Sequence, residues 1–255
     1  MMRVHLVSDV HGAVEPLRRA GQEADALICL GDLLCFLDYF DYDAGVFGSL
    51  FGPEAVARLV QLRTAGRFEQ ARDWSRSLWA GLPDARTAMD EAIDAQYAEL
   101  FAAMPTPTYA TYGNVDIPDR WDKHAHSGVR ILDGKVVEIG GLRFGFVGGG
   151  LPTPMRTPYE ISEDAYAAKV EALGPVDVLC AHIPPAVPEL TYDVLARRLE
   201  RGSSALYDAI VEHQPALMFF GHVHQPLAGR YRIGRSECIN VGHFARTKVP
   251  YVLDL

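Results

Sequence analysis

The sequence contains few cysteines, and their spacing excludes several common kinds of site. Only four are present among 255 residues. No two of them form the Cys-x-x-Cys spacing of structural zinc sites or thioredoxin-like redox motifs. Cys29 and Cys180 lie within apolar segments, so we expect buried thiols rather than disulfides. Free thiols are typical of a reducing compartment, and we predict a cytoplasmic protein.

The sequence also lacks any apolar run near the ~20 residues that a transmembrane helix requires. Residues 1–7 pass straight into a predicted strand, without the charged and apolar regions of a secretory signal. We therefore expect no membrane partner. A nucleotide-binding P-loop is excluded too, because no Gly-Lys-Ser or Gly-Lys-Thr follows the glycines at 148–150. We expect a tight turn at those glycines, and the alternative is a cradle of backbone amides for an anion.

Basic residues are too few to give the protein an overall positive surface. Lys and Arg number 24 against 33 Asp and Glu, and the formal charge is −9 at pH 7. This balance argues against binding of duplex nucleic acid through its phosphate backbone. Bound cations can reverse the sign of a pocket locally, so a small anionic substrate remains compatible with the composition.

Apolar segments that alternate with helical patterns predict an α/β fold. The predicted strands span residues 3–7, 26–30, 108–112, 176–181 and 216–220. Most are continuous apolar runs, as expected for sheets covered on both faces. Helical patterns lie between them at 13–20, 162–173 and 203–213. We expect two sheets packed face to face, with helices outside.

Shorter strands are predicted in residues 129–147 and 231–255. Asp133-Gly134 separates residues 129–132 from 135–139, and such a dipeptide between apolar runs is a strong hairpin signal. Gly140-Gly141 then leads into residues 142–147 and predicts a second hairpin.

Residues 33–107 form a helical insertion within what we predict to be a single domain of residues 1–255. Helices are expected at 53–65, 67–80 and 83–104, since Pro53 and Pro83 suit first-turn positions. The segment begins with an aromatic-rich stretch. Either these aromatics make a small satellite core, or the insertion caps the active site and shapes the substrate pocket.

Residues of metal-ligand type lie at the ends of the predicted strands: Asp9, His11, Asp32, Asn114, His182, His222 and His224. Alternate residues of an extended segment point the same way, so Asp9 and His11 can reach one ion, as can the two histidines of His222-Val223-His224. Open α/β sheets place their sites at the carboxyl ends of strands, which is where this set lies.

Two adjacent divalent ions are the simplest partner for this set. Hydrolytic two-metal sites hold ions roughly 3.5–4 Å apart and need a bridging carboxylate. Asp32 is the natural bridge, because it follows a strand and a glycine that lets the backbone approach. Mixed oxygen and imidazole ligands suit Mn, Fe, Zn, Co or Ni better than calcium, and we favour manganese among them.

The chain resembles the calcineurin-like metallophosphoesterase family in five blocks that occur in the expected order. These blocks are Asp9-Val10-His11-Gly12, Gly31-Asp32, Gly113-Asn114-Val115-Asp116, Ala181-His182 and Gly221-His222-Val223-His224. The resemblance implies a four-layer αββα sandwich of two mixed β-sheets with a dinuclear centre. It also implies that Asp9, His11, Asp32 and His224 hold one ion. Asp32, Asn114, His182 and His222 would hold the other.

One position departs from the family pattern. Many members have Gly-Asn-His-Asp in the third block, where the histidine contacts the phosphate and protonates the leaving group. Here the position is Val115, which can neither donate a proton nor bind an oxyanion. We therefore expect substrates whose leaving group needs little protonation, which favours phosphodiesters over alkyl monoesters.

Other residues could act beside the ions. Asp32 and Asn114 are candidates both for metal binding and for catalysis. Asp116 is a candidate for catalysis alone, because its family counterpart orients the missing histidine. His243 follows a predicted strand and is a candidate acid or supporting residue, since histidine is the usual proton-transfer group. His124 and His126 are weaker candidates of the same kind, in a segment that we interpret as solvated.

Together these patterns predict a metal-dependent hydrolase of phosphate esters. A phosphodiesterase that uses a hydroxide bridging two divalent metals is favoured. The expected partner is a small phosphate ester, with nucleotides among the candidates, and no pattern addresses the oligomeric state. The alternatives are a non-catalytic metal-binding scaffold of the same fold, a phosphomonoesterase or a nuclease.

Overall fold

Two large mixed β-sheets lie face to face at the centre of this computed structural model, which describes residues 2–255. One sheet has the strand order β13-β1-β2-β3-β4 and the other β11-β12-β10-β7-β6-β5. The first comprises β1 (Arg3–Val7), β2 (Ala26–Cys29), β3 (Thr108–Ala110), β4 (Val129–Ile131) and β13 (Tyr251–Asp254). The second comprises β5 (Lys135–Ile139), β6 (Leu142–Val147), β7 (Val178–Ala181), β10 (Leu217–Phe220), β11 (Arg230–Ile233) and β12 (Ser236–Asn240). A small ribbon pairs β8 (Tyr192–Asp193) with β9 (Arg198–Leu199).

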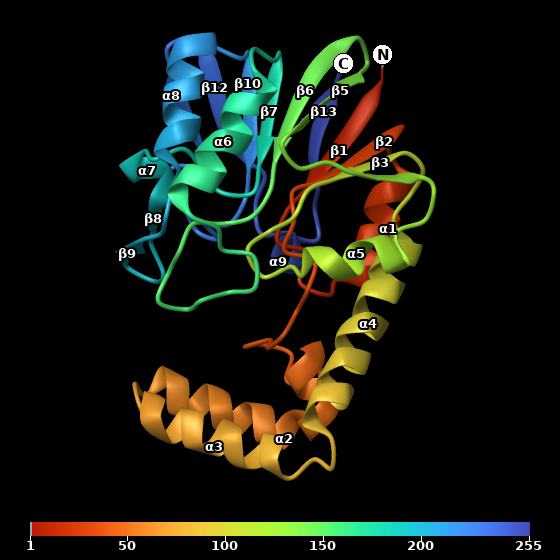
Figure 1. The fold of residues 1–255 in the computed structure, drawn as a ribbon, viewed down its shortest axis with the longest axis vertical. Helices are drawn as coiled ribbons and strands as arrows, with labels where there is room; N and C mark the ends of the chain where they lie inside the picture. The colour runs from red at the N-terminus through yellow and green to blue at the C-terminus, as the bar shows by residue number, and fades with distance from the viewer. Residues whose placement is uncertain (1) are drawn as a thin grey trace.

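Helices cover the outer faces of both sheets (Figure 1). On the first sheet lie α1 (Val14–Gln22), α4 (Ala85–Ala103) and α5 (Pro118–His124). On the second lie α6 (Glu163–Leu173) and α8 (Ser204–His213). The remaining helices are α2 (Gly45–Thr64), α3 (Phe68–Ala80), α7 (Pro188–Thr191) and α9 (Phe244–Thr247). The predicted α/β fold of two mixed sheets with flanking helices is confirmed.

Apolar residues alternate between two cores along the central strands. In β1, Val4 and Leu6 face the space between the sheets, whereas Val7 faces the outer core under α1 and α4. In β2, Ile28 faces the inner core and Leu27 the outer one. Side chains on a strand alternate between faces, and here both faces are buried. This is why the strands read as continuous apolar runs rather than alternating ones.

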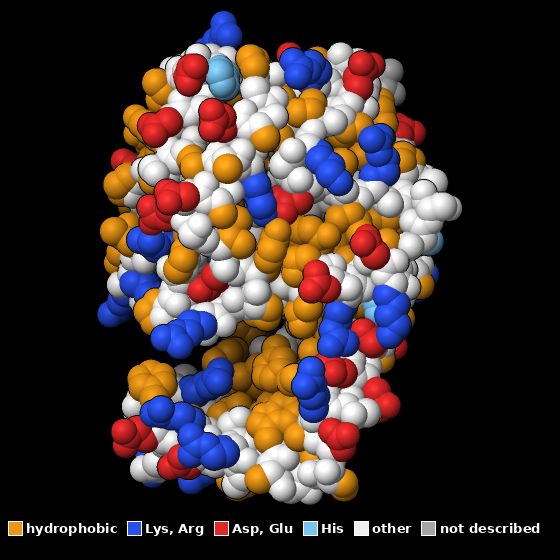
Figure 2. Space-filling view, in the orientation of Figure 1, with side chains coloured by type: hydrophobic (Ala, Val, Ile, Leu, Met, Phe, Trp, Pro, Cys, Tyr) orange, Lys and Arg blue, Asp and Glu red, His pale blue; other side chains and the backbone are white. Residues whose placement is uncertain are grey.

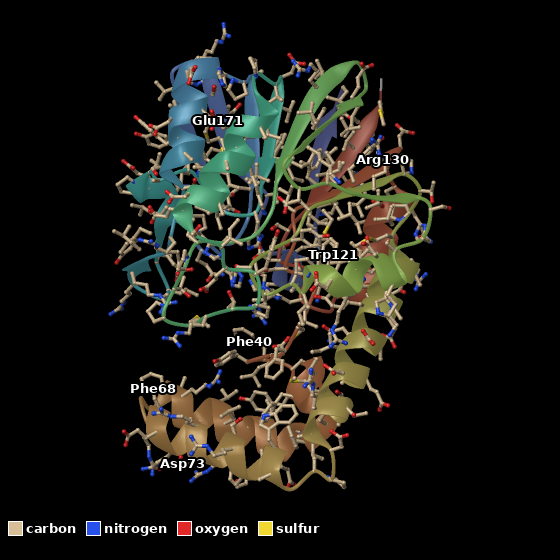
Figure 3. The ribbon with its side chains drawn as sticks, viewed as in Figure 1. Phe40, Phe68, Asp73, Trp121, Arg130 and Glu171 are labelled. Carbon is tan, nitrogen blue, oxygen red and sulfur yellow. The ribbon has the colours of Figure 1, made fainter. Side chains whose placement is uncertain are left out.

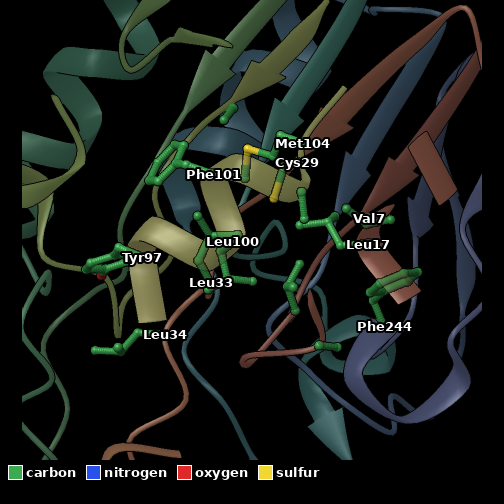
Figure 4. Close-up of a cluster of buried hydrophobic side chains, with 14 of the residues drawn as sticks. Val7, Leu17, Cys29, Leu33, Leu34, Tyr97, Leu100, Phe101, Met104 and Phe244 are labelled. Carbon is green, nitrogen blue, oxygen red and sulfur yellow. The ribbon is translucent and has the colours of Figure 1, made fainter. Parts of the chain in front are cut away.

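The outer core of the first sheet also anchors loops beyond the strand ends. Leu33, Leu34 and Phe244 pack there together with Tyr97 and Phe101 of α4 (Figure 4). Leu33 comes directly after Asp32, and Phe244 directly after His243. Packing of these neighbours therefore fixes the backbone from which the candidate site residues project.

The hairpin predicted at Asp133-Gly134 is wrong. β4 pairs in parallel with β3 in the first sheet, while β5 pairs with β6 in the second, so the chain crosses between sheets here. Gly134 has a φ of 62°, and the Asp133 carboxylate accepts hydrogen bonds from the Gly148 amide and Lys169. A turn dipeptide fixes the local bend, but the partner of the next strand depends on the inner core. The predicted Gly140-Gly141 hairpin is present between β5 and β6.

The insertion divides into two parts. The C-terminal half of α4 packs into the outer core, so it belongs to the sandwich. By contrast, α2 and α3 project as an arm with a separate apolar cluster that includes Phe47, Val56 and Leu59. The arm lies opposite the strand ends that approach α9 (Figure 1), and Figure 2 shows a hollow between arm and sandwich lined by hydrophobic, Lys and Arg side chains. α2 is longer than predicted and breaks at Gly52, just before Pro53.

Among residues 2–255, no helix combines the length and apolar character needed to cross a bilayer.

Phe101 should contribute strongly to the stability of the sandwich through the outer core. Replacing the fully buried Phe101 by alanine removes an aromatic ring from it, and we expect the free energy of unfolding to fall by about 3–5 kcal/mol. Phe68, which is 67% exposed on α3, is the matched control and should change it by less than about 0.5 kcal/mol. Urea denaturation of the two variants measures the difference, and equal losses would contradict this account of the core.

Candidate metal centre

All seven predicted ligands lie at one edge of the sandwich. Asp9, Asp32 and Asn114 follow β1, β2 and β3, which run parallel to one another in the first sheet. His182 and His222 follow β7 and β10, which are parallel neighbours in the second. Since the carboxyl ends of parallel strands meet at the same edge, the two sheets bring these side chains together across their interface.

The Asp32 carboxylate lies between histidines from the two halves of the site. Its Oδ2 lies 3.9 Å from Nε2 of His11, and its Oδ1 lies 3.5 Å from Nε2 of His182. The second carboxylate, Asp9, has Oδ1 at 3.9 Å from Nε2 of His11 and 3.2 Å from Nε2 of His224. Both carboxylates are buried, with 1% of Asp9 and 3% of Asp32 exposed. The site is thus a buried pair of carboxylates ringed by imidazoles.

Backbone contacts leave lone pairs facing the carboxylates. Nδ1 of His182 lies 2.8 Å from the Leu30 carbonyl oxygen, and Nδ1 of His11 lies 3.1 Å from that of Leu34. A carbonyl only accepts, so each Nδ1 carries the proton, and with a single proton on the ring Nε2 has the lone pair that a metal ligand needs. These Nε2 atoms face the Asp32 oxygens. Lone pairs on both sides of such a gap fit a cation between them, so the donor set suits metal ions.

Asn114 completes the half of the site that His182 and His222 form. Its Oδ1 lies 2.9 Å from both Nε2 of His182 and Nδ1 of His222. The amide is oriented by Thr157, whose Oγ1 accepts a hydrogen bond of 3.0 Å from Nδ2 and donates to Glu160. Thr157 therefore decides that the oxygen of Asn114 faces the histidines. The sequence analysis missed this residue, because no motif marks a threonine 43 positions away.

Four of the ligands have a backbone conformation that non-glycine residues rarely adopt. The φ angles are 56° at Asp9, 38° at His11, 52° at Asp32 and 66° at His222. Each such residue costs on the order of 1–3 kcal/mol, and such strain persists only where surrounding structure imposes it. Strained residues of this kind cluster at functional sites, which supports a functional role for this edge of the sandwich.

Asp116 is one of the groups that impose this conformation. It is fully buried, and its carboxylate accepts hydrogen bonds from the amides of Asp32 and Gly113, at 2.8 Å each, and of Leu33, at 3.0 Å. Burial and the nearby charge of Asp32 raise its pKa to about 6, against the effect of these amides. Because its contacts are mainly to backbone, Asp116 positions the Asp32 loop, whereas its family counterpart orients a histidine side chain.

Charge is distributed unevenly between the two halves of the site. Burial alone would raise the pKa of Asp9, but the hydrogen bond and charge of His224 hold it well below its usual range. Burial would lower the pKa of His224, but Asp9 raises it. Burial and the neighbouring His182 lower the pKa of His222 to about 4. A neutral imidazole is the form that binds a metal, so His222 is ready to do so at pH 7.

His243 lies beside the ligands on the side of His11 and His224. Its ring stacks on that of His224 with centroids 3.7 Å apart, and it lies 5.6 Å from the ring of His11. One ligand atom from each of the three histidines lies within 4.8 Å of those of the other two. Among the described residues, Nδ1 of His243 has no hydrogen-bond partner although it is buried. A buried nitrogen without a hydrogen-bond partner, beside such a cluster, indicates that the site binds a further group.

His124, His126 and the glycines at 148–150 make contacts within the protein. The segment 122–126 is mostly exposed, as predicted, although His124 at the end of α5 contacts Asp94 at 3.2 Å. Nε2 of His126 lies 3.2 Å from the Met104 carbonyl oxygen. The amides of residues 148–150 all donate hydrogen bonds within the protein, so these glycines do not form an anion cradle.

Glycines let separate backbones approach the carboxylates. A Cβ at Gly221 would clash with Ser8 Oγ and Asp9 Oδ2, and one at Gly113 would clash with Oδ1 and the amide of Asp32. The space taken by a larger residue would therefore displace a ligand oxygen.

Substitution at Gly221 tests this requirement. We expect Gly221→Ala to move the Asp9 carboxylate and to weaken Mn²⁺ binding, measured by calorimetry, about 10–100-fold. Gly229 is the matched control, because a Cβ there meets no atom within 4 Å and its φ is not in the left-handed region. Gly229→Ala should bind Mn²⁺ like the unsubstituted protein. Unchanged Mn²⁺ binding in Gly221→Ala would show that the close approach of the Gly221 backbone to the Asp9 carboxylate is not required.

Comparison with known proteins finds one matching family and similar solved structures. The family Metallophos, described as Calcineurin-like phosphoesterase, matches residues 2–226. The solved structure of TT1561 from Thermus thermophilus is 15% identical and has a TM-score of 0.55, covering 99% of this chain and 98% of that one. A conserved protein of Streptococcus pneumoniae, described as a predicted phosphoesterase, is 13% identical, with a TM-score of 0.34 and coverage of 96% and 74%. No curated protein matches. Because the family match spans most of its length and all seven ligand positions, this chain belongs to the calcineurin-like phosphoesterase family.

Proposed function

We propose that this phosphoesterase is metal-dependent and prefers phosphodiesters. The observation that carries the metal dependence is the position of Asp32, whose two oxygens face lone-pair nitrogens of His11 and His182 from opposite halves of the site. A carboxylate so placed can be shared by two cations. Membership of the family supports phosphoester hydrolysis as the reaction class.

The residues divide into two ligand sets that share Asp32. Asp9, His11, Asp32 and His224 would hold one ion, while Asp32, Asn114, His182 and His222 would hold the other. When bound, divalent cations of this kind neutralise charge on phosphate oxygens and lower the pKa of a water molecule toward neutrality. The donor set of carboxylate, amide oxygen and imidazole suits Mn²⁺ and its first-row neighbours, with Mn²⁺ favoured.

The residues around the ligands keep this arrangement in place during the reaction. Asp116 fixes the backbone of Asp32, and Thr157 orients Asn114, so neither ligand has to reorganise as charge develops. His243 would support this side of the site, because its ring stacks on that of His224. Support of this kind is worth about tenfold or more in metal affinity or activity.

Val115 supports a preference for diesters with good leaving groups. Its amide donates a hydrogen bond of 3.0 Å to Asp32 Oδ1, and its side chain packs against the outer core. At this position the side chain cannot protonate a departing alkoxide. Leaving groups of low pKa depart without such help, which favours activated or aryl diesters over alkyl monoesters.

Removing the charge of Asp32 tests the proposal. We expect Asp32→Asn to lower the amount of bound Mn²⁺, measured by elemental analysis, and to reduce hydrolysis of bis(4-nitrophenyl) phosphate at least about a hundredfold. Glu171→Gln on the exposed surface of α6 removes the same charge and is the control. Metal bound at full occupancy without turnover in the unsubstituted protein would favour the scaffold alternative. Undiminished hydrolysis in Asp32→Asn would exclude the proposed site.

Restoring a histidine at position 115 tests the preference for diesters. In Val115→His, an imidazole follows Asn114 and can donate a proton to the leaving oxygen, so we expect kcat/KM for an alkyl phosphomonoester to rise about tenfold or more. The value for an aryl diester should change less. Val115→Leu is the size control and should show no gain with the monoester. Equal gains with both esters would show that the side chain at position 115 does not determine the preference for diesters.

A further inference from the structure

Arg246 lies at the margin of the metal centre on a rigid support. It belongs to α9, which begins directly after His243. The amide of Phe244 donates to the carbonyl of Ser8 at 3.0 Å, and that of Ala245 to the carbonyl of Asp9 at 2.9 Å. The short helix is therefore tied to the same loop that carries the Asp9 ligand. A side chain on α9 is held in a fixed relation to the site.

The guanidinium of Arg246 stacks on an exposed aromatic ring. Its Cζ lies 3.7 Å from the centroid of the Phe40 ring, which is 69% exposed. Phe40 comes eight residues after Asp32 and lies between the sandwich and the arm (Figure 3). The Asp38 carboxylate accepts a hydrogen bond of 2.7 Å from the Phe40 amide and fixes the local turn. The pair thus joins the segments that follow two different site residues, Asp32 and His243.

Arg246 has no carboxylate partner among residues 2–255, whereas Arg230, also above a ring, pairs with Glu237 at 3.1 Å. Stacking uses the face of the guanidinium and leaves the N–H groups on its edge free. Those groups match the oxygens of a phosphate in a planar, two-point contact. An unpaired, stacked arginine on a helix that is tied to the Asp9 loop is thus suited to an anion.

We propose that Arg246, held in place by Phe40, binds a non-bridging phosphate oxygen of the substrate. This inference rests on the proposed phosphoesterase site and assigns to it a cation that the protein itself supplies. Val115 stands where the family pattern has a histidine, and its side chain cannot bind an oxyanion. Arg246 provides that contact from a different segment of the chain. Arg246 is then a substrate-binding residue, and Phe40 is a positioning residue that acts through it.

Inorganic phosphate and a diester together test the assignment. With the Mn²⁺-loaded protein, we expect Arg246→Ala to weaken phosphate binding, measured by calorimetry, about tenfold or more. The KM for bis(4-nitrophenyl) phosphate should rise by a similar factor, with a smaller change in kcat. Arg246→Lys should recover only part of the affinity, because an ammonium lacks the planar fork. Phe40→Ala should give a smaller loss of the same kind, and Phe40→Tyr should behave like the unsubstituted protein.

Arg130 provides the matched control. It lies on β4, at the edge of the first sheet, and its guanidinium is 5.6 Å from the ring of Tyr109 on β3. Arg130→Ala should leave phosphate affinity, KM and metal content unchanged. Unaltered phosphate affinity and KM in Arg246→Ala would overturn the assignment, as would a loss of bound Mn²⁺ in that variant, which would indicate a structural role. If the unsubstituted protein hydrolyses no ester, the proposed function fails, but the phosphate titrations still decide whether Arg246 binds the anion.

Discussion

Burial of two carboxylates side by side is the constraint on which this site depends. Asp9 and Asp32 are almost inaccessible to water, and each shares His11 as a neighbour. Uncompensated buried charges cost several kcal/mol, so the fold must supply partners. It does so with imidazoles and with backbone amides: that of His222 donates to Asp9, and that of Val115 to Asp32. The remaining lone pairs converge in a way that suits divalent cations.

The same constraint explains why many surrounding residues hold the backbone of the site in place. Left-handed residues, glycines without room for a Cβ, and the buried Asp116 all bring amides and ligands within reach of the two carboxylates. Apolar neighbours such as Val10, Leu33 and Phe244 anchor those loops in the outer core. The strain stored in the loops is thus offset by packing in the adjacent layer. Function at this edge and stability of the sandwich are therefore linked.

The groups that we propose to face the substrate come from less regular parts of the chain. Val115 removes a proton donor from the third block, while His243 and Arg246 approach from the segment after β12. Phe40 comes from the beginning of the insertion, so the insertion and the sandwich both contribute to the stacked pair. The proposed metal ligands follow strand ends, whereas the residues proposed to bind the ester lie on loops and helices, which vary more readily.

The sequence by itself determined the strands, the mixed α/β fold and the seven ligand-type residues, because apolar runs and the polar residues that end them are local patterns. It could not determine the partner of β4, the burial of Trp121 or the acceptors of the amides at residues 148–150. Each of those depends on which distant surface accepts an amide or an apolar face. Only the tertiary structure brought Thr157 to Asn114 and Phe40 to Arg246. Such contacts join residues far apart in the chain, and short-range periodicity carries no information about them.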